Sequence, residues 1–235
     1  EDKNGDIWTA NSTSHSTHYG IVHPNRRTTG VVQQITSVNG SYEITNTLDL
    51  NGGPLIGTLV AAPDGNLYVG VEVHGLANGI IQWVTASGSG PLTVGTLAVG
   101  PFMHPIVGLA AAEGELWAVE SVPAGHIFDL PARFSTHSII HRIDLHTLET
   151  HFKWISPGAR AVAVLPDLDP YTSSVAITDH HRVLRIKFDG EHLRHDGHVR
   201  FDGRVEGLSY AADGSLWASS RGTTGFVLEE ILYTT

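Results

Sequence analysis

Residues 57–71 read GTLVAAPDGNLYVGV, and this stretch decides the fold. A run of small and β-branched residues meets a Pro-Asp-Gly turn, and a second run that contains a tyrosine follows it. Turn-forming residues between two runs of strand formers are typical of a β-hairpin. The stretch therefore predicts two antiparallel strands, an inner strand A and a second strand B that carries a bulky aromatic side chain.

The same hairpin recurs in degenerate form further along the chain. Residues 108–121 read GLAAAEGELWAVES, residues 207–220 read GLSYAADGSLWASS, and another copy begins at Ala161. A third strand, C, follows the hairpin, as in SIIHRIDL from Ser138 and RVLRIKFDG from Arg182, and a fourth stretch, D, completes the unit. A period of roughly 45–53 residues is that of a four-stranded blade of a β-propeller.

The two ends of the chain decide the number of blades. Residues 4–12, NGDIWTANS, enter the repeat at strand B, so the first copy lacks strand A, and the last copy lacks strand D. The sequence predicts a single all-β domain over residues 1–235, a β-propeller of about five four-stranded blades. Six blades, or closure that needs an upstream segment, are the alternatives within this fold, and a β-sandwich is the alternative fold.

The charge balance limits the partners of the protein. The chain has 14 Lys and Arg residues against 24 Asp and Glu residues, a formal net charge of −10. Nucleic acids and anionic membranes both require a basic surface, so neither is expected as a partner. The expected partner is a small-molecule substrate. The chain has no cysteine, which excludes disulfides and thiolate metal ligands. No signal for the oligomeric state is present.

Two features favour a secreted or periplasmic location. The chain begins with Glu1 instead of methionine, as after removal of a leader. Asn11-Ser12-Thr13 and Asn39-Gly40-Ser41 are glycosylation sequons, which are used only on the secretory route.

The repeat resembles a known group of propellers. The phrases PDGNLYVG, EGELWAVE and DGSLWASS, with IIHRIDLHTLET, are similar to blades of the streptogramin lyase, senescence marker protein/gluconolactonase and NHL-like group. The resemblance covers most of the chain and describes a blade more than an activity. In the gluconolactonase-like enzymes a glutamate at the start of an inner strand is a metal ligand, and Glu206 in VEGLS looks similar.

The histidines gather in the predicted B–C and D–A connections, on the face where propeller enzymes bind substrate. Imidazole is a common metal ligand and transfers protons near neutral pH, so this clustering predicts a metal site or an acid–base site. The remaining histidines, including His141, fall on outer strands and C–D connections, where solvated side chains are expected. The clustered set comprises nine of the 15 histidines: His15, His18, His23, His74, His104, His126, His137, His180 and His181.

Carboxylates extend this candidate site. Glu206 stands immediately before strand A of the last copy, where the other copies have Ile56, Val107 and Arg160. A charge beside the propeller axis needs a counter-ion, either a metal or an arginine such as Arg160. The predicted ligands of a divalent ion (Ca, Mg, Mn or Zn) are the side chains at the ends of inner strands and in nearby loops: Glu72, His74, His104, Glu120, Asp179 and Glu206.

These residues favour a metal-assisted, lactonase-like lyase or hydrolase that acts on a small polar or anionic molecule. The metal would polarise a carbonyl group, His126 or His180 would move the proton, and Arg160 or Arg221 would orient an anionic group. Two alternatives stay open: a carbohydrate-binding propeller lectin without catalysis, and a metal-free cyclase or lyase that uses the histidines as acids and bases. Catalytic turnover would distinguish the lectin from the two enzymes. Loss of activity on metal removal would distinguish the metal-assisted enzyme from the metal-free one.

Overall fold

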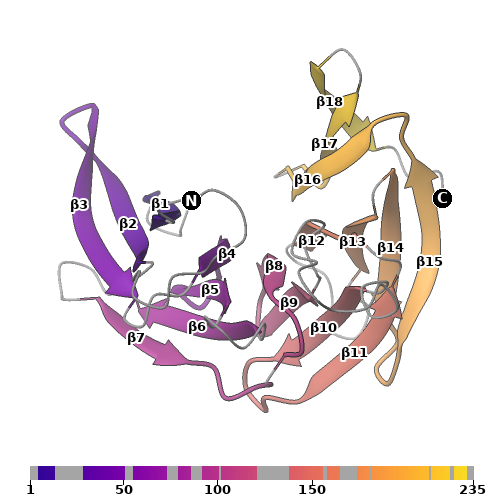
Figure 1. Cartoon of the computed structure of the whole chain (residues 1–235), viewed down its shortest axis with the longest axis horizontal. Helices are drawn as coiled ribbons and strands as arrows, with labels where there is room; N and C mark the ends of the chain where they lie inside the picture. Colours follow the sequence, from indigo (N-terminus) through magenta and orange to yellow (C-terminus); the bar gives the residue numbers. More distant parts are fainter. Residues whose placement is uncertain are drawn as a thin grey trace, which may run out of the picture. The chain divides into compact units, whose positions relative to one another are not determined.

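The computed structural model describes residues 5–13, 29–50, 55–72, 79–85, 92–100, 102–120, 138–155, 158–164, 174–179, 181–211, 213–222 and 225–231. These residues form strands and turns and no helix, and the strands assemble into antiparallel sheets in which sequence neighbours pair (Figure 1). In the same part of the chain no helix has the length and apolar character that a membrane span requires. The prediction of an all-β fold is confirmed.

The chain divides into two compact units, Glu1–Ile106 and Val107–Thr235, and a single domain over the whole chain stays a prediction. The first unit holds one three-stranded sheet, in the order β1-β2-β3, and one four-stranded sheet, in the order β4-β5-β6-β7. Its strands are β1 (Ile7–Thr13), β2 (Thr29–Val38), β3 (Ser41–Leu50), β4 (Leu55–Ala61), β5 (Asn66–Glu72), β6 (Gly79–Thr85) and β7 (Thr93–Thr96).

The two sheets of the first unit share one hydrophobic cluster. Strand β5 alternates, and its buried Leu67, Val69 and Val71 join Trp8 of β1 and Val32 of β2 in this cluster. Burial of each such side chain contributes about 1.5–3 kcal/mol, so this packing holds the two sheets together. The quoted hairpin therefore forms as predicted, with the aromatic strand B inside.

The second unit begins with β8 (Ile106–Ala112), whose first residue still belongs to the first unit. Its sheets have the orders β8-β9-β10-β11, β12-β13-β14-β15 and β16-β17-β18. The remaining strands are β9 (Glu115–Glu120), β10 (Ser138–Asp144), β11 (Thr150–Ile155), β12 (Val162–Val164), β13 (Ser174–Asp179), β14 (Arg182–Phe188), β15 (Leu193–Arg200), β16 (Arg204–Tyr210), β17 (Leu216–Gly222) and β18 (Gly225–Ile231).

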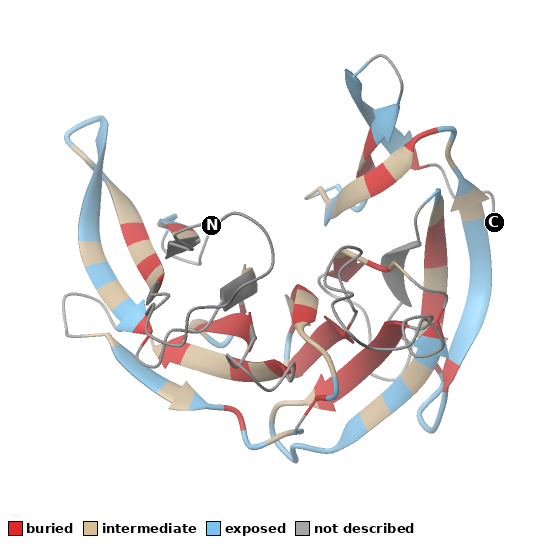
Figure 2. Cartoon of the chain, in the orientation of Figure 1, coloured by how far each residue is buried: buried red, intermediate tan, exposed pale blue. Residues whose placement is uncertain are grey.

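Consecutive sheets of the second unit pack face to face. Trp117 and Ile140 of one sheet lie in a cluster with Ile186 and Phe188 of the next. A second cluster joins β12–β15 to β16–β18 and includes the fully buried Ala218 of β17. Figure 2 shows the result as buried middle strands and exposed outer strands within the sheets.

The sheets at the two ends of the chain have three strands each in the described residues, whereas the other three have four. The first lacks the inner strand A and the last lacks the outer strand D, as the sequence predicts. The effect on the last sheet is plain in its burial: β18 is exposed at every residue but Ile231, whereas its repeat counterpart β10 is buried from Ser138 to Ile143.

Candidate functional site

Glu206 lies in a β-bulge of the inner strand β16. Val205 pairs with Ser220 and Gly207 pairs with Ser219, so Glu206 is the extra residue on its strand. A bulge bends the strand and re-aims a side chain, and bulges are over-represented next to functional sites. The bulge therefore turns the Glu206 carboxylate out of the regular alternation of β16.

The first unit has the same bulge, with glycine in place of glutamate. In β4, Ile56 pairs with Val71 and Thr58 pairs with Gly70, which leaves Gly57 as the extra residue. The pairing thus aligns Glu206 with Gly57, and the alignment with Ile56 expected from the sequence is wrong by one residue. The two A–B turns have the same length, and the shift arises in the inner strand, where Gly207 aligns with Thr58 and not with Gly57.

Two arginines hold the Glu206 carboxylate. Arg160 Nη1 donates a hydrogen bond to Oε2 at 3.2 Å, and Arg204 Nε lies 3.4 Å from Oε1. The three side chains are 38%, 33% and 26% exposed for Arg160, Arg204 and Glu206, so solvent and small solutes reach the group. Arg221 on β17 is the register partner of Arg204. We call Arg160, Arg204 and Glu206 the arginine cluster; Arg221 lies on the neighbouring strand.

The arginine cluster has more positive than negative charge: two guanidinium groups and one carboxylate. Nε and Nη2 of Arg204 are buried atoms that form no hydrogen bond with the described residues. A buried N–H without an acceptor is costly, and a charged one more so. The planar guanidinium fork matches the two oxygens of a carboxylate, so an anionic ligand would satisfy these donors.

A second ionisable group lies in the neighbouring sheet. Glu120 ends β9 with 1% of its surface exposed, and its Oε2 lies 2.8 Å from Nε2 of His141 on β10. The other oxygen of Glu120, Oε1, is buried and forms no hydrogen bond with the described residues. A buried carboxylate oxygen without a hydrogen bond is costly in free energy, and a proton, a ligand or an ion would remove that cost.

The expectation that His141 is solvated is wrong. Strand β10 alternates, and Ile139, His141 and Ile143 point to one face of the sheet. His141 is 9% exposed because this face is packed, and the imidazole meets Glu120 there. A carboxylate that fixes the orientation of an imidazole is a common arrangement for proton transfer.

The other predicted site residues fall mostly outside the described side chains. His74, His126 and His180 lie outside the described residues. Glu72 and Asp179 are the last residues of β5 and β13, as predicted, but only their backbone is described.

Two further residues of the predicted site, His104 and Arg221, lie in the part of the chain that the structure describes. His104 is half-buried in the first unit, and its carbonyl oxygen would be 2.6 Å from a Cβ at Gly79, so the backbones meet closely there. Arg221 is exposed, and its guanidinium carbon lies 5.6 Å from the ring centroid of Phe226. The roles proposed for both stay predictions.

A divalent ion finds no ready site among the described side chains. No three His, Asp or Glu side chains of the described residues come together closely enough to hold one. Both oxygens of Glu206 face guanidinium groups, which compete with a cation for the carboxylate. The predicted metal set therefore stays a prediction that depends on Glu72, His74 and Asp179.

Sequence reasoning missed two members of these groups, Arg204 and His141. A signal existed for each. Arg204 stands two residues before Glu206, and His141 occupies an apolar position of the alternating segment IIHRID. Neither signal is specific without the pairing register, which shows that Arg204 faces Arg221 and that His141 shares a face with Glu120.

No family model and no curated protein matches the chain, whereas solved structures do. A glucose dehydrogenase matches at 14% identity and a TM-score of 0.59, over 99% of this chain and 78% of that one. The soluble aldose sugar dehydrogenase from Escherichia coli, in the apo-form, matches at 12% identity and a TM-score of 0.56, over 97% and 78%. A streptogramin B lyase matches at 18% identity and a TM-score of 0.53, over 98% and 63%.

These likenesses show the fold and nothing finer. The chain has the β-propeller fold and resembles the propeller group that the sequence indicated. It spans less than two thirds of the streptogramin B lyase chain, at 63%. Because one fold hosts many activities, the function has to be argued from the site.

Proposed function

We propose that the protein is a propeller enzyme of the lyase or hydrolase type that acts on a small anionic molecule bound by the arginine cluster. The observation that carries the proposal is Arg204: its Nη2 is a buried atom that forms no hydrogen bond with the described residues, and its Nε is held only by the ion pair with Glu206 at 3.4 Å. A substrate carboxylate would accept from these donors.

The substrate class follows from the charges of the arginine cluster. One carboxylate, that of Glu206, pairs with the two guanidinium groups of Arg160 and Arg204, and this excess of positive charge favours an anionic ligand. A sugar acid, or the lactone that hydrolyses to one, combines such a carboxylate with hydroxyl groups. Two structurally similar proteins are sugar dehydrogenases by name, which supports a sugar-derived substrate.

Proton transfer in this proposal belongs to the histidines. The Glu120–His141 pair supplies an imidazole whose ring is oriented by a buried carboxylate. His126 and His180 are the further candidates from the sequence. The metal-assisted version adds an ion that polarises the carbonyl group, and its ligands would come from Glu72, His74, His104, Glu120, Asp179 and Glu206. The alternative without turnover is a carbohydrate-binding propeller.

Turnover of a lactone and sugar-acid panel tests the proposal. Arg204→Gln removes the charge but keeps a polar side chain, and we expect kcat/KM to fall roughly 10- to 100-fold, as for loss of a charged hydrogen bond. The matched control is Arg200→Gln, an exposed arginine on the outer strand β15. Equal turnover by the two variants would overturn the assignment of the arginine cluster.

Metal content separates the two enzymatic versions. Elemental analysis of the wild type tests them directly: a stoichiometric divalent ion supports the metal-assisted version, and its absence after Ca, Mg, Mn and Zn have been supplied supports the metal-free version. A stoichiometric ion that is present in the wild type and absent from Glu206→Gln would show that Glu206 is a metal ligand and that the metal-assisted version is correct.

We also propose a secreted or periplasmic location. Of the two sequons, the one at Asn39 lies in the β2–β3 turn, where Asn39 is exposed with a left-handed φ of 52° and Gly40 has a φ of 82°. The side chain is therefore accessible to glycosylation. Expression through a eukaryotic secretory pathway is expected to give a glycosidase-sensitive mass increase that Asn39→Gln reduces, and no increase would count against this location.

A further inference from the structure

Two histidines of the outer strand β15 lie side by side on one face of their sheet. The ring centroids of His195 and His198 are 6.0 Å apart, and the ring planes are tilted by 31°. The proposed function uses neither residue, and neither belongs to the ligand set predicted at the inner strands. We propose that this pair binds one late first-row divalent metal ion, Cu²⁺, Ni²⁺ or Zn²⁺, through one imidazole nitrogen of each ring.

A β-bulge brings the two imidazoles together. In a regular strand, residues that are three positions apart point to opposite faces of the sheet. His195 pairs with Ile186 of β14, but His198, three residues further on, pairs with Leu184, which is only two residues back. The extra residue of β15 puts both histidines on the same face. Gly197, which lies between them, has a φ of 125°, a conformation that glycine adopts without strain.

The carboxylate nearest in sequence lies on the other face of the sheet. Asp196, between the two histidines, forms ion pairs with Arg185 Nε at 2.8 Å and Lys187 Nζ at 3.0 Å. Both cations alternate with Ile186 along β14, so they point away from the face of the histidines. Asp196 is therefore not a third ligand, and the sheet separates its two cationic partners from an ion held by the histidines.

The distance between the rings fits a shared ion. Metal–nitrogen bonds of about 2.0–2.1 Å place the centroids of two coordinating imidazoles roughly 4.5–6.5 Å apart, for bond angles of about 90–180°. The 6.0 Å between His195 and His198 lies in that range. Both side chains are exposed and form no hydrogen bond or ion pair with the described residues, so their rings are free to turn toward an ion.

The two ligands also determine the kind of ion. Imidazole suits copper, nickel and zinc, whereas calcium and magnesium require oxygen ligands. Only two protein ligands meet here among the described side chains, so water would complete the coordination sphere and the ion would exchange with solvent. Of these ions, Cu²⁺ binds a given nitrogen site most tightly, which makes it the probe of choice.

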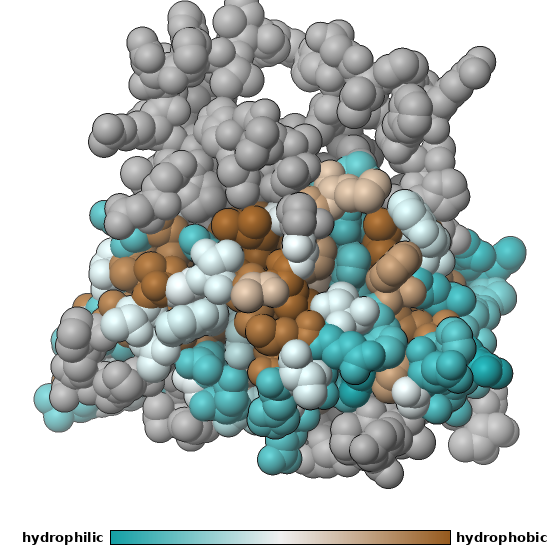
Figure 3. All heavy atoms as spheres, turned by 90° about the horizontal axis from the view of Figure 1, so that it is seen from below, coloured by the Kyte–Doolittle hydropathy of each residue, from teal (hydrophilic) through white to brown (hydrophobic). Residues whose placement is uncertain are grey.

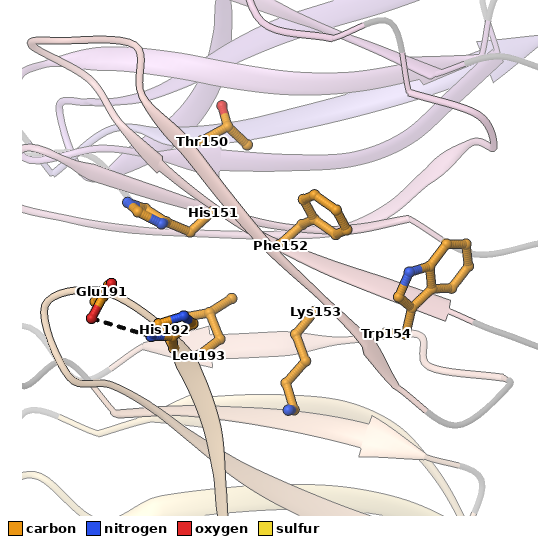
Figure 4. A pocket seen from close by; sticks show the side chains of 8 residues that line it. All are labelled: Thr150, His151, Phe152, Lys153, Trp154, Glu191, His192 and Leu193. Atoms are coloured by element: carbon orange, nitrogen blue, oxygen red, sulfur yellow. Dashed lines mark ion pairs between the residues drawn. The ribbon is translucent and has the colours of Figure 1, made fainter.

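Calorimetric titration with Cu²⁺ tests the pair. We expect the wild type to bind, and His195→Gln and His198→Gln each to lose one equivalent of Cu²⁺ or to weaken its Kd roughly 10-fold or more. The matched control is His192→Gln, an exposed histidine in the β14–β15 turn whose Nδ1 lies 3.6 Å from Glu191 Oε2 (Figure 4). Because this imidazole faces Glu191 and not the pair, the control is expected to bind Cu²⁺ like the wild type.

Four results would overturn the proposal. They are the absence of Cu²⁺ binding up to about 1 mM, wild-type binding by both His195→Gln and His198→Gln, a loss in only one of them, which would mean a single imidazole ligand, and an equal loss in His192→Gln. Melting temperatures show whether each variant is folded. Arg204→Gln is expected to bind Cu²⁺ like the wild type, so failure of this site and failure of the arginine cluster give different results.

Discussion

At the scale of single residues, the best-defined interaction is a buried ion pair between Glu115 and Arg142. Their side chains are 4% and 8% exposed, and Arg142 Nε donates to Glu115 Oε1 at 3.0 Å. The other carboxylate oxygen accepts from Trp117 Nε1 at 3.1 Å, and the guanidinium lies 4.0 Å from the Phe188 ring centroid. The ion pair thus connects Trp117 of β9 to Phe188 of the next sheet.

Glu115→Gln is expected to lower the free energy of unfolding by about 3–5 kcal/mol, because it leaves the Arg142 charge buried without its counter-ion. Urea unfolding followed by tryptophan fluorescence measures this change. Glu191→Gln, at a side chain that is 84% exposed, is the control and is expected to change stability little. A loss below about 1 kcal/mol in Glu115→Gln would show that the pair contributes no more than a surface ion pair.

The sequence identified some site residues and not others for a physical reason. Glu206 stood out because it interrupts an internal repeat, which needs no knowledge of pairing. Arg204 and His141 depend on register: one residue of slip would move either side chain to the other face of its sheet. The bulge that places Glu206 lies between Val205 and Gly207 of β16, and it too is visible only once the pairing is known.

At the scale of elements, the C–D turns of two successive sheets share one device. Asp144 and Asp189 each accept backbone hydrogen bonds through Oδ1, from His146 and Thr147 in the first turn, both at 2.8 Å. Hydrogen bonds from the Thr147 backbone above all, and also from His146, hold the pKa of Asp144 below its ordinary value of 3.8. Backbone donation from His192 lowers the pKa of Asp189 in the same way.

These shifts predict the direction of acid unfolding. A carboxyl group whose pKa is lower in the folded state adds stability above its unfolded pKa, near 3.8 for Asp144, and loses it as pH falls through the folded value. We therefore expect the contribution of these two aspartates to the free energy of unfolding to be constant between about pH 7 and 5 and to fall below about pH 4.

Asp144→Asn isolates this effect, since the amide oxygen still accepts hydrogen bonds but carries no charge. Between about pH 5 and 3, a window around the ordinary aspartate pKa, the free energy of unfolding of this variant is expected to fall less than that of the wild type. Glu43→Gln, an exposed carboxyl on β3, is the control. An acid profile of Asp144→Asn that is parallel to the wild type would contradict the role of this turn.

At the scale of the whole molecule, the repeat allowed the sheets to be predicted, because each copy carries its own turn and aromatic signals. Even the missing strands of the first and last sheets followed from the sequence. The two compact units did not, since no composition change marks residue 106. Hydrophobic residues also reach the surface among hydrophilic ones on the face that Figure 3 shows. On β18, Phe226 and Leu228 are 72% and 65% exposed.

Strand β18 is an edge strand of its sheet among the described residues, and its apolar side chains are exposed. We expect it to promote association of the protein at high concentration, since an exposed apolar edge strand is a template for further pairing. Leu228→Lys is expected to reduce concentration-dependent light scattering while changing stability by less than about 0.5 kcal/mol. Ile231→Lys, on the same strand but 5% exposed, is expected to destabilise the fold instead. Scattering by Leu228→Lys that equals the wild type would show that this edge is not involved.

The central claim is that the arginine cluster binds an anionic small molecule, and calorimetric titration with an aldonate such as gluconate tests it most directly. We predict that the wild type binds, that salt weakens binding, and that Arg204→Gln raises Kd roughly 10-fold or more whereas Arg200→Gln does not. Absence of binding by every aldonate tested, or equal affinity in the wild type and Arg204→Gln, would contradict the claim.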